Sequence, residues 1–368
     1  MTPMTAAIVV LAAWLTAAFV YRVLALRAVD SLCRPSSAPR PEAPEPPLRV
    51  VAIRPLHGTA PWLEPCLESL WNESAATRTP LVLGWTDDDD PAASVVARVQ
   101  ARSPWPAEVR VGTGPPGENP KVANMIQMTS GLHADVLLQS DADVRVGSGY
   151  VAAMTAPFAD PSVGLATCPY RSVPGAGLAS RLDALITNTH FLPSACLAVQ
   201  LEGLHFGLGA TIAVRTSALA QAGGLDALLT TPADDYMLAR NVEAAGARLA
   251  WVPEVVEHAV TDASWSGALR RHLRWARVTR HVRFRGYCGQ ILTHGSIPCL
   301  LITTLFLRAH RHVWLLPLLF WWGSQAVILW RQRRPLGMRA RDLPLLPLAD
   351  LIAFLVYLGG LVGSAQPS

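Results

Sequence analysis

The stretch 135-DVLLQSDADVRVG-147 decides the fold class, because a short apolar run ends abruptly at two carboxylates. A run of this length, bounded by polar residues, is typical of a strand buried inside a sheet. Residues i and i+2 of an extended segment point to the same side, so Asp141 and Asp143 can face one divalent cation. Asp is equally common in turns, where its side chain bonds to nearby backbone. The spacing alone therefore leaves a turn and a metal site open.

Strand and helix patterns alternate on the N-terminal side of this stretch. The alternation is typical of βαβ units and predicts an α/β domain with a parallel, Rossmann-like sheet over residues 49–263. In such sheets ligands bind beyond the carboxyl ends of the strands, so the residues that follow each strand are the site candidates. The predicted strands are 49–56, 80–86, 108–112 and 135–140, and the predicted helices are 61–73, 91–102 and 120–132.

Both ends of the chain are unusually apolar. Of the 368 residues, 51% are hydrophobic and only 16% are charged, which is too apolar for a soluble protein of this size. Residues 5–26 carry a single charge and are long enough to span a bilayer, and no basic segment precedes them as in a signal peptide. We therefore expect a transmembrane anchor over 1–28, a stiff proline-rich linker over 29–48 and more spans within 286–368. The expected C-terminal spans lie near 290–307, 313–330 and 344–363.

Arginines cluster beside these apolar segments, after the first span and in the loop 331–341. The positive-inside rule then places residues 27–285 on the cytoplasmic side. The net charge is only +4, and its position beside the membrane segments indicates lipid headgroups rather than nucleic acid as partners. The six cysteines form no CxxC pair or zinc-type cluster, so we expect reduced thiols.

A second acidic pair, Asp234 and Asp235, stands at the start of a predicted helix over 232–248. Carboxylates in a first turn stabilise a helix through its dipole and its free N–H groups, which alone explains most such pairs. A carboxylate that stays ionised there can also take a proton from an attacking hydroxyl. Asp235 is therefore a candidate general base.

The segment 264–285 has a basic face and an apolar stripe at helical spacing. A helix of this kind beside membrane spans is predicted to lie in the membrane interface, and that position explains its arginines. The adjacent Arg274 and Trp275 also offer a guanidinium that can grip a diphosphate and a flat ring for a sugar or lipid group.

Three further features have two interpretations each. Lys121, in the first turn of a predicted helix, is either a surface lysine or a cation near donor phosphates. The glycine-rich stretch 203–225 is either a flexible loop or the wall of a substrate slot, where backbone must approach closely. His190 taken alone is more typical of a buried core histidine.

The order of these motifs resembles a known family. DDDDP, NPK, DAD, ADDY and RHLRW follow an N-terminal anchor and precede an apolar bundle, as in the ceramide glucosyltransferase family, a membrane-anchored branch of the family 2 glycosyltransferases. The resemblance runs from the anchor to about residue 290. Within the family the chain is most similar to the hopanoid-associated bacterial branch, in 54-RPLHG-58, 189-THFLPS-194 and 272-HLRWARVTR-280. It implies a GT-A domain on the cytoplasmic face of a bacterial inner membrane, in a multi-pass protein.

The resemblance also implies roles for individual residues. Asp141 and Asp143 form a DxD motif that binds Mg²⁺ or Mn²⁺, and Asp235 is the catalytic base. The acidic run 87–90 leaves the first aspartate uncertain by about a position, and the ceramide enzymes carry DSG where this chain has DAD. The implied donor-binding residues are Asp90, Lys121, Asp141, Arg271, Arg274 and Trp275, and the implied acceptor-slot residues are His190 and Asp234.

The implied reaction is an inverting transfer of a sugar, with GlcNAc favoured, from UDP-GlcNAc or UDP-glucose to a hydroxyl of a membrane lipid. The favoured acceptor is the hopanoid bacteriohopanetetrol, and the first alternative is a ceramide-like lipid. A polysaccharide synthase is less favoured, because four short spans are too few to enclose a polymer channel. A non-enzymatic membrane binding or transport protein is disfavoured because the predicted spans contain almost no charges.

Overall fold

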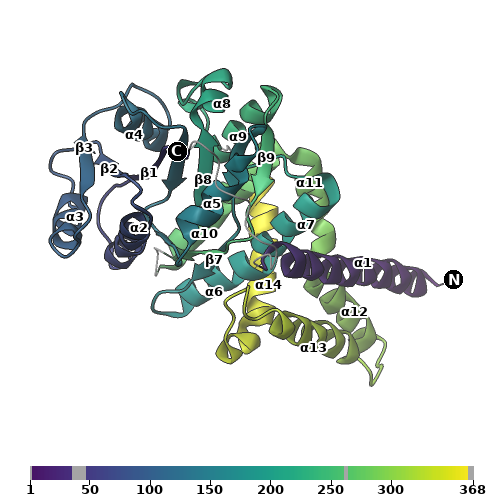
Figure 1. The fold of residues 1–368 in the computed structure, drawn as a ribbon. Coiled ribbons are helices and arrows are strands. Elements are labelled where there is room, and N and C mark those ends of the chain that lie inside the picture. The colour runs from purple at the N-terminus through teal and green to yellow at the C-terminus, as the bar shows by residue number, and fades with distance from the viewer. Residues whose placement is uncertain (1, 35–46, 261–263, 364–368) are drawn as a thin grey trace. The chain divides into compact units, whose positions relative to one another are not determined.

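The computed structural model describes residues 2–34, 47–260 and 264–363 (Figure 1). Its chain divides into two compact units. The predicted catalytic segment 49–263 is interrupted, because residues 171–198 belong with the helices of the chain's two ends. The predicted linker falls largely on residues 35–46, outside the described residues. The α/β unit comprises Leu32–Tyr170 and Val199–Thr261, and the helical unit comprises Met1–Ser31, Arg171–Ala198 and Asp262–Ser368.

A seven-stranded sheet with the order β3-β2-β1-β4-β8-β6-β9 forms the centre of the α/β unit. Strands β1 to β4 pair in parallel, which confirms the predicted Rossmann-like half. Strand β8 runs antiparallel to both β4 and β6, so the sheet is mixed rather than wholly parallel. The strands are β1 (Val50–Pro55), β2 (Leu81–Trp85), β3 (Ala107–Val111), β4 (Val136–Ser140), β6 (Val163–Thr167), β8 (Thr211–Arg215) and β9 (Arg248–Trp251).

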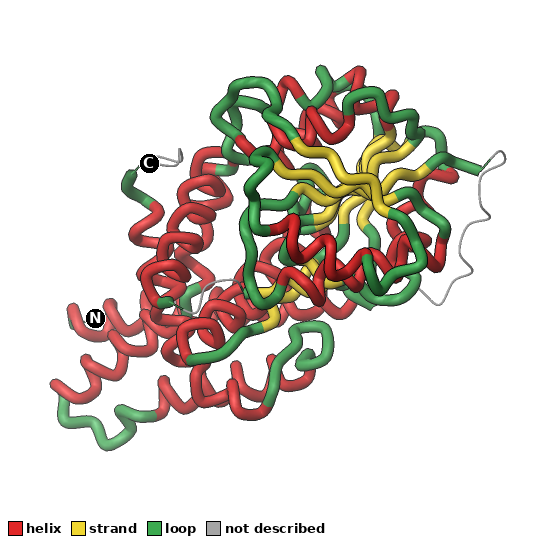
Figure 2. Tube along the Cα trace, turned by 90° about the vertical axis from the view of Figure 1, so that its left-hand side faces the viewer, coloured by secondary structure: helices red, strands yellow, loops and turns green. Residues whose placement is uncertain are grey.

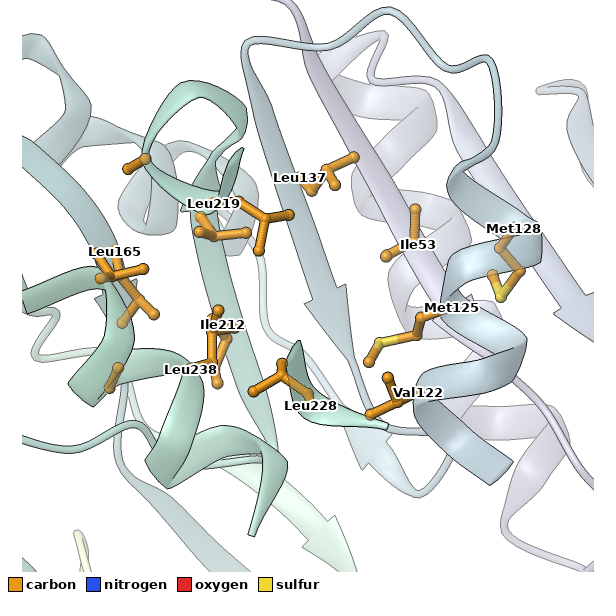
Figure 3. Packing of buried hydrophobic residues seen from close by; sticks show 14 of the residues in the cluster. Ile53, Val122, Met125, Met128, Leu137, Leu165, Ile212, Leu219, Leu228 and Leu238 are labelled. Carbon is orange, nitrogen blue, oxygen red and sulfur yellow. The ribbon is translucent and has the colours of Figure 1, made fainter. Parts of the chain in front are cut away.

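Helices cover both sides of this twisted sheet, which explains its unbroken apolar strands (Figure 2). All residues of β2 and β4 are buried. On one side, Val122, Met125 and Met128 of α4 join strand residues such as Ile53 in one apolar cluster (Figure 3). The helices are α2 (Leu63–Thr77), α3 (Ala92–Gln100), α4 (Pro120–Thr129), α5 (Tyr150–Thr155), α8 (Thr216–Gln221) and α9 (Asp234–Ala244), with 3₁₀ turns η1 (Ala156–Ala159) and η3 (Asp226–Leu228).

A short antiparallel ribbon extends from the DAD segment. Strand β5 (Val144–Arg145) pairs with β10 (Val256–Ala259), and the register sets His258 opposite Val144. The pairing therefore places His258, from the end of the α/β unit, beside Val144, the residue that follows Asp143. The segment β7 (Tyr170–Val173) lies at the boundary of the two units.

The helical unit packs around α14, which contacts α6, α10, α12 and α13. Leu273 and Ala276 of α10 meet Gly359 and Gly360 of α14 so closely that a Cβ atom on either glycine would clash. The helices are α1 (Pro3–Leu32), α6 (Leu178–Ile186), α7 (Leu192–Glu202), α10 (Trp265–Val282), α11 (Phe284–Gly289), α12 (Ser296–Arg308), α13 (Leu316–Arg331) and α14 (Leu346–Gly360), with a π-helical turn η2 (Thr187–Phe191) and 3₁₀ turns η4 (Gln290–Thr293) and η5 (Ala340–Leu345).

Two helices in the described part of the chain, Pro3–Leu32 and Ala340–Gly360, are long and apolar enough to cross a membrane. A third span arises if Phe284–Thr293 and Ser296–Arg308, which meet at a 41° bend, are taken together. The segment predicted at 313–330 forms α13, whose 16 residues rise only about 24 Å against a hydrocarbon core of about 30 Å. By itself α13 is too short to span.

Candidate active site

The DAD segment is both a turn and a half-buried pair of carboxylates at the end of β4. The Val144 N–H donates to the Asp141 carbonyl at 3.2 Å, which closes the turn. Arg54, fully buried, donates to Ser140 Oγ at 2.8 Å and to the Val144 carbonyl at 3.0 Å, so it holds both sides of this turn. The backbone is thereby fixed while the two carboxylates remain partly accessible.

Lys121 joins the two acidic motifs. Its Nζ lies 2.7 Å from Asp141 Oδ1 and 3.5 Å from Asp234 Oδ2. Burial opposes its charge, but these two carboxylates raise the pKa of Lys121 above its ordinary value. Burial raises the pKa of Asp141, and the charge of Lys121 opposes that rise. Lys121 is therefore an internal counter-ion of the site rather than a free surface lysine.

Asn119 ties the start of α4 to the segment before α9. Its side-chain oxygen accepts the Val122 N–H at 3.2 Å as a helix cap. Its amide group donates to the Thr231 carbonyl at 3.0 Å and to Asp234 Oδ1 at 3.3 Å. The predicted helix start and the predicted acidic pair are thus held together by one side chain.

Asp143 has one paired and one unpaired oxygen. His258 Nε2 lies 3.3 Å from Asp143 Oδ2. Among the described residues, Asp143 Oδ1 is buried and has no hydrogen-bond partner. Burial alone would raise the pKa of Asp143, but the charge and hydrogen bond of His258 hold it below the ordinary value. An ionised carboxylate with an unused buried oxygen fits a cation ligand.

Asp235 stands in the first turn of α9, where its Oδ1 accepts the Tyr236 N–H at 2.8 Å. Burial first, and the charge of Asp234 second, raise the pKa of Asp235 to about 6. The glycine-rich loop packs directly on it, because a Cβ atom at Gly209 would lie 2.9 Å from Asp235 Oδ2. Only glycine at that position leaves room for the carboxylate.

Two residues near this site are not indicated by the sequence. His258 lies in β10, more than a hundred residues from Asp143, and a lone histidine in an alternating strand carries no motif. The buried Tyr170 ring lies 5.7 Å from the His258 ring. Burial, with a smaller contribution from the charges of Asp235 and Asp141, raises the pKa of Tyr170. Tyr170 is therefore a neutral hydroxyl beside the carboxylates.

Asp90, the expected first aspartate, organises a different turn of the same unit. Its carboxylate is buried and accepts the Gly58 N–H at 2.9 Å and the Ala92 N–H at 2.8 Å, and His57 Nδ1 lies 3.3 Å from it. Asp90 thus joins the loop after β1 to the start of α3. Asp87 and Asp89, in contrast, are exposed.

The remaining candidates lie in the helical unit. The Arg271 guanidinium pairs with Asp183, whose second oxygen lies 2.9 Å from His272 Nε2. The Trp275 ring packs edge-on to His272 at 5.6 Å, and Arg274 is exposed. His190 lies 3.3 Å from Asp350. The α/β unit therefore brings together five of the predicted residues: Lys121, Asp141, Asp143, Asp234 and Asp235.

This cluster sits beyond the carboxyl end of β4 and holds four carboxylates against one ammonium group. The profile of glycosyl transferase family 21 matches residues 8–365. The chain belongs to glycosyl transferase family 21. It is therefore a glycosyltransferase, which confirms the predicted enzyme class and, at the level of the family, the predicted resemblance.

One solved structure supports the fold, and a second is reported beside it. The mannosyltransferase PcManGT from Pyrobaculum calidifontis, in complex with GDP-Man and Mn²⁺, matches with a TM-score of 0.57 and 18% identity, over 97% of this chain and 99% of that chain. Glucosyl-3-phosphoglycerate synthase from Mycobacterium tuberculosis, in complex with Mn²⁺, UDP and phosphoglyceric acid, matches with a TM-score of 0.43 and 14% identity, over 68% and 86% of the two chains. The first of these likenesses confirms a GT-A-like fold.

Proposed function

We propose that this family 21 glycosyltransferase moves a sugar from a UDP-sugar to a hydroxyl of a membrane lipid. The single observation that carries the proposal is the grouping of Asp141, Asp143 and Asp235 around Lys121 at the carboxyl end of β4. The apolar helices Pro3–Leu32 and Ala340–Gly360 favour a lipid acceptor. The proposed donor is UDP-GlcNAc or UDP-glucose, and the favoured acceptor is the hopanoid bacteriohopanetetrol.

A divalent ion, Mg²⁺ or Mn²⁺, fits the carboxylates of Asp141 and Asp143. Such an ion would bind the buried Asp143 oxygen that has no hydrogen-bond partner among the described residues, and it would balance the excess of carboxylates over cations. His258, on the other oxygen of Asp143, is proposed to orient that carboxylate from outside the metal shell. When bound, the ion offsets the negative charge that develops on the departing UDP. The likeness to a mannosyltransferase that was solved with Mn²⁺ agrees with this assignment.

Asp235 is proposed as the general base. A carboxylate whose pKa is about 6 is ionised at neutral pH yet basic enough to accept the hydroxyl proton. As the acceptor oxygen bonds to the anomeric carbon, its proton passes to Asp235, and the bond to UDP breaks with the electron pair leaving on the diphosphate. The attack comes from the side opposite UDP, so the configuration inverts.

The other predicted residues are proposed to place the two substrates. Lys121 is proposed to share its ammonium group between Asp141 and a donor phosphate. Asp90 is proposed to fix the turn that binds the nucleotide. Asp234 borders the acceptor hydroxyl. Arg271, Arg274 and Trp275 are proposed to contact the donor, with the exposed Arg274 as the diphosphate partner. His190 is proposed for the acceptor side.

The test is a transfer assay in membranes that contain the full chain. Radiolabelled UDP-GlcNAc, UDP-glucose and GDP-mannose are supplied separately, and the labelled lipid is identified by mass. Label from UDP-GlcNAc in a hopanoid supports the proposal, whereas label from UDP-glucose in a ceramide-like lipid replaces the favoured substrate pair by the alternative one. Asp235→Asn should abolish labelling and the exposed matched control Asp226→Asn should not. No lipid label from any donor would overturn a lipid acceptor.

A further inference from the structure

The helical unit holds a second group of potential metal ligands, formed by His190, His294 and Asp350. Each offers one ligand atom, and the three atoms lie within 4.8 Å of one another. His190 Nε2 and Asp350 Oδ1 are 3.3 Å apart. Two ligands of one tetrahedral zinc ion, with bonds of about 2.0–2.2 Å, are separated by roughly that distance. The distances from the His294 ligand atom to the other two ligand atoms have to shorten by at most about 1.5 Å for all three to bind one ion.

Asp350 is oriented so that one oxygen stays available. Its Oδ2 accepts hydrogen bonds from Ser296 Oγ and, at 3.2 Å, from Trp321 Nε1. The Ser296 hydroxyl in turn accepts the Trp322 indole N–H at 3.0 Å. Asp350 Oδ1 and His294 Nδ1 are buried and have no hydrogen-bond partner among the described residues. Such outer hydrogen bonds are how proteins aim a carboxylate at a metal.

Backbone irregularities place the two histidines, and a regular helix places the aspartate. His190 lies in the π-helical turn η2, a feature found often at functional sites. His294 lies at the 41° break between η4 and α12, where Gly295 packs so tightly on the Trp321 ring that a Cβ atom would be 2.4 Å from it. Asp350 is an acidic residue inside a helix that is apolar enough to span a membrane, a position typical of functional residues.

The charges around the group select the kind of metal. Arg22 of α1 is buried, donates to the Thr189 carbonyl, and acts electrostatically on Asp350 and both histidines. One carboxylate facing one arginine is a poor site for Mg²⁺ or Ca²⁺, which bind mainly through negatively charged oxygens. Two imidazole nitrogens instead suit Zn²⁺ and similar first-row ions.

We propose that His190, His294 and Asp350 bind a Zn²⁺-type divalent ion in the helical unit, distinct from the Mg²⁺ or Mn²⁺ proposed at Asp141 and Asp143. The three protein ligands leave a fourth position for water or a hydroxyl ligand. This second site goes beyond the proposed function and does not depend on it. The carboxylates of the α/β unit select an oxygen-preferring ion, and the histidines of the helical unit select a nitrogen-preferring one.

The test is metal retention by the full chain purified in detergent. The protein is stripped with a chelator, supplied with Zn²⁺, desalted and analysed for metal content. Wild type should retain a single Zn²⁺ per chain, and excess Mg²⁺ should not displace it. Asp141→Asn should retain it as well, as should His281→Ala, a matched control at an exposed histidine. His294→Ala and Asp350→Asn should lose at least about tenfold in zinc affinity.

Two outcomes overturn the proposal: wild type that retains no zinc, and His294→Ala protein that retains as much as wild type. Because ligand variants of a buried site can misfold, zinc X-ray absorption on the wild-type protein supplies a second measurement. Two imidazole nitrogens and one carboxylate oxygen in the first shell are expected. A shell made only of oxygen ligands contradicts the assignment.

Discussion

Asp143 of the α/β unit is a half-buried carboxylate and Asp183 of the helical unit is a buried one, and the two are partnered in opposite ways. Asp183 is paired on both oxygens, by Arg271 and by His272. Asp143 has His258 on one oxygen and nothing among the described residues on the other. A carboxylate whose bonds are all made within the chain stabilises the fold, whereas one that is left incomplete is available for a ligand. Four experiments test that distinction.

The largest effect is expected from Asp235→Asn. The amide keeps the size of the side chain but cannot accept the hydroxyl proton, so transfer should fall by roughly 10²–10⁴-fold. Binding of UDP-sugar, measured by calorimetry, should survive, because the carboxylate is assigned to the acceptor. Loss of donor binding in this variant would move Asp235 out of the role of base.

Asp143→Ala should weaken metal activation by about 10–100-fold, as expected for removal of an important metal partner. The measurement is transfer rate against Mn²⁺ concentration, with Asp160→Ala as the control, since Asp160 makes only surface contacts. Wild-type activity that persists unchanged in EDTA contradicts a metal at Asp143.

Stability should respond to Asp183 and Asp235 in opposite directions. Burial would raise the pKa of Asp183, but His272 and Arg271 hold it below the ordinary value, so its stabilisation is present at neutral pH and is lost as the pH falls through the lowered pKa. Asp235 has a raised pKa of about 6, so its ionisation destabilises the fold as the pH rises through that value.

Asp183→Asn should therefore lower the unfolding temperature at pH 8, by an amount that corresponds to about 3 kcal/mol for a broken buried pair. Asp235→Asn should raise the unfolding temperature at the same pH. Thermal unfolding in detergent at pH 8 and pH 5 measures both. A decrease for both variants at pH 8 would show that Asp235 is a structural carboxylate like Asp183.

The smallest effect is a shift of the pH profile. Transfer should rise with pH through about 6 as Asp235 ionises. The Asp234 charge is one cause of the raised pKa, so Asp234→Asn should move the midpoint of the profile to lower pH. The profile of kcat/KM measures the midpoint in the free enzyme. A midpoint that stays in place or rises contradicts the assignment of the titration to Asp235.

The sequence predicted the elements that lead to the site but not every contact within it. Strand β4, helix α4 and the start of α9 follow from apolar periods and from a proline and an asparagine at the helix starts, all of which are local signals. The pairing of Asp143 with His258 depends on the β5–β10 register, which joins residues that are distant in sequence. The antiparallel direction of β8 is likewise invisible in the pattern TIAVR, because alternation does not depend on strand direction.

The helical unit departs further from expectation. Residues 171–198 fall within the predicted catalytic domain 49–263, yet they fold among the terminal helices. Two charged residues of the predicted spans, Arg22 and Asp350, are buried and interact electrostatically. A single charged residue barely changes the average hydropathy of a long apolar segment. Its functional interest shows only when the structure places it next to other polar groups.

Asn119 gives the active site one further property. Its side chain caps α4 and donates to Thr231 and Asp234, and its own N–H donates to the Leu229 carbonyl at 3.0 Å. These bonds join the start of α4 to the segment before α9. Lys121, two residues later, and Asp235, next to Asp234, are thereby kept at a set spacing. The distance between the proposed phosphate contact and the proposed base is therefore set by the fold before a substrate binds.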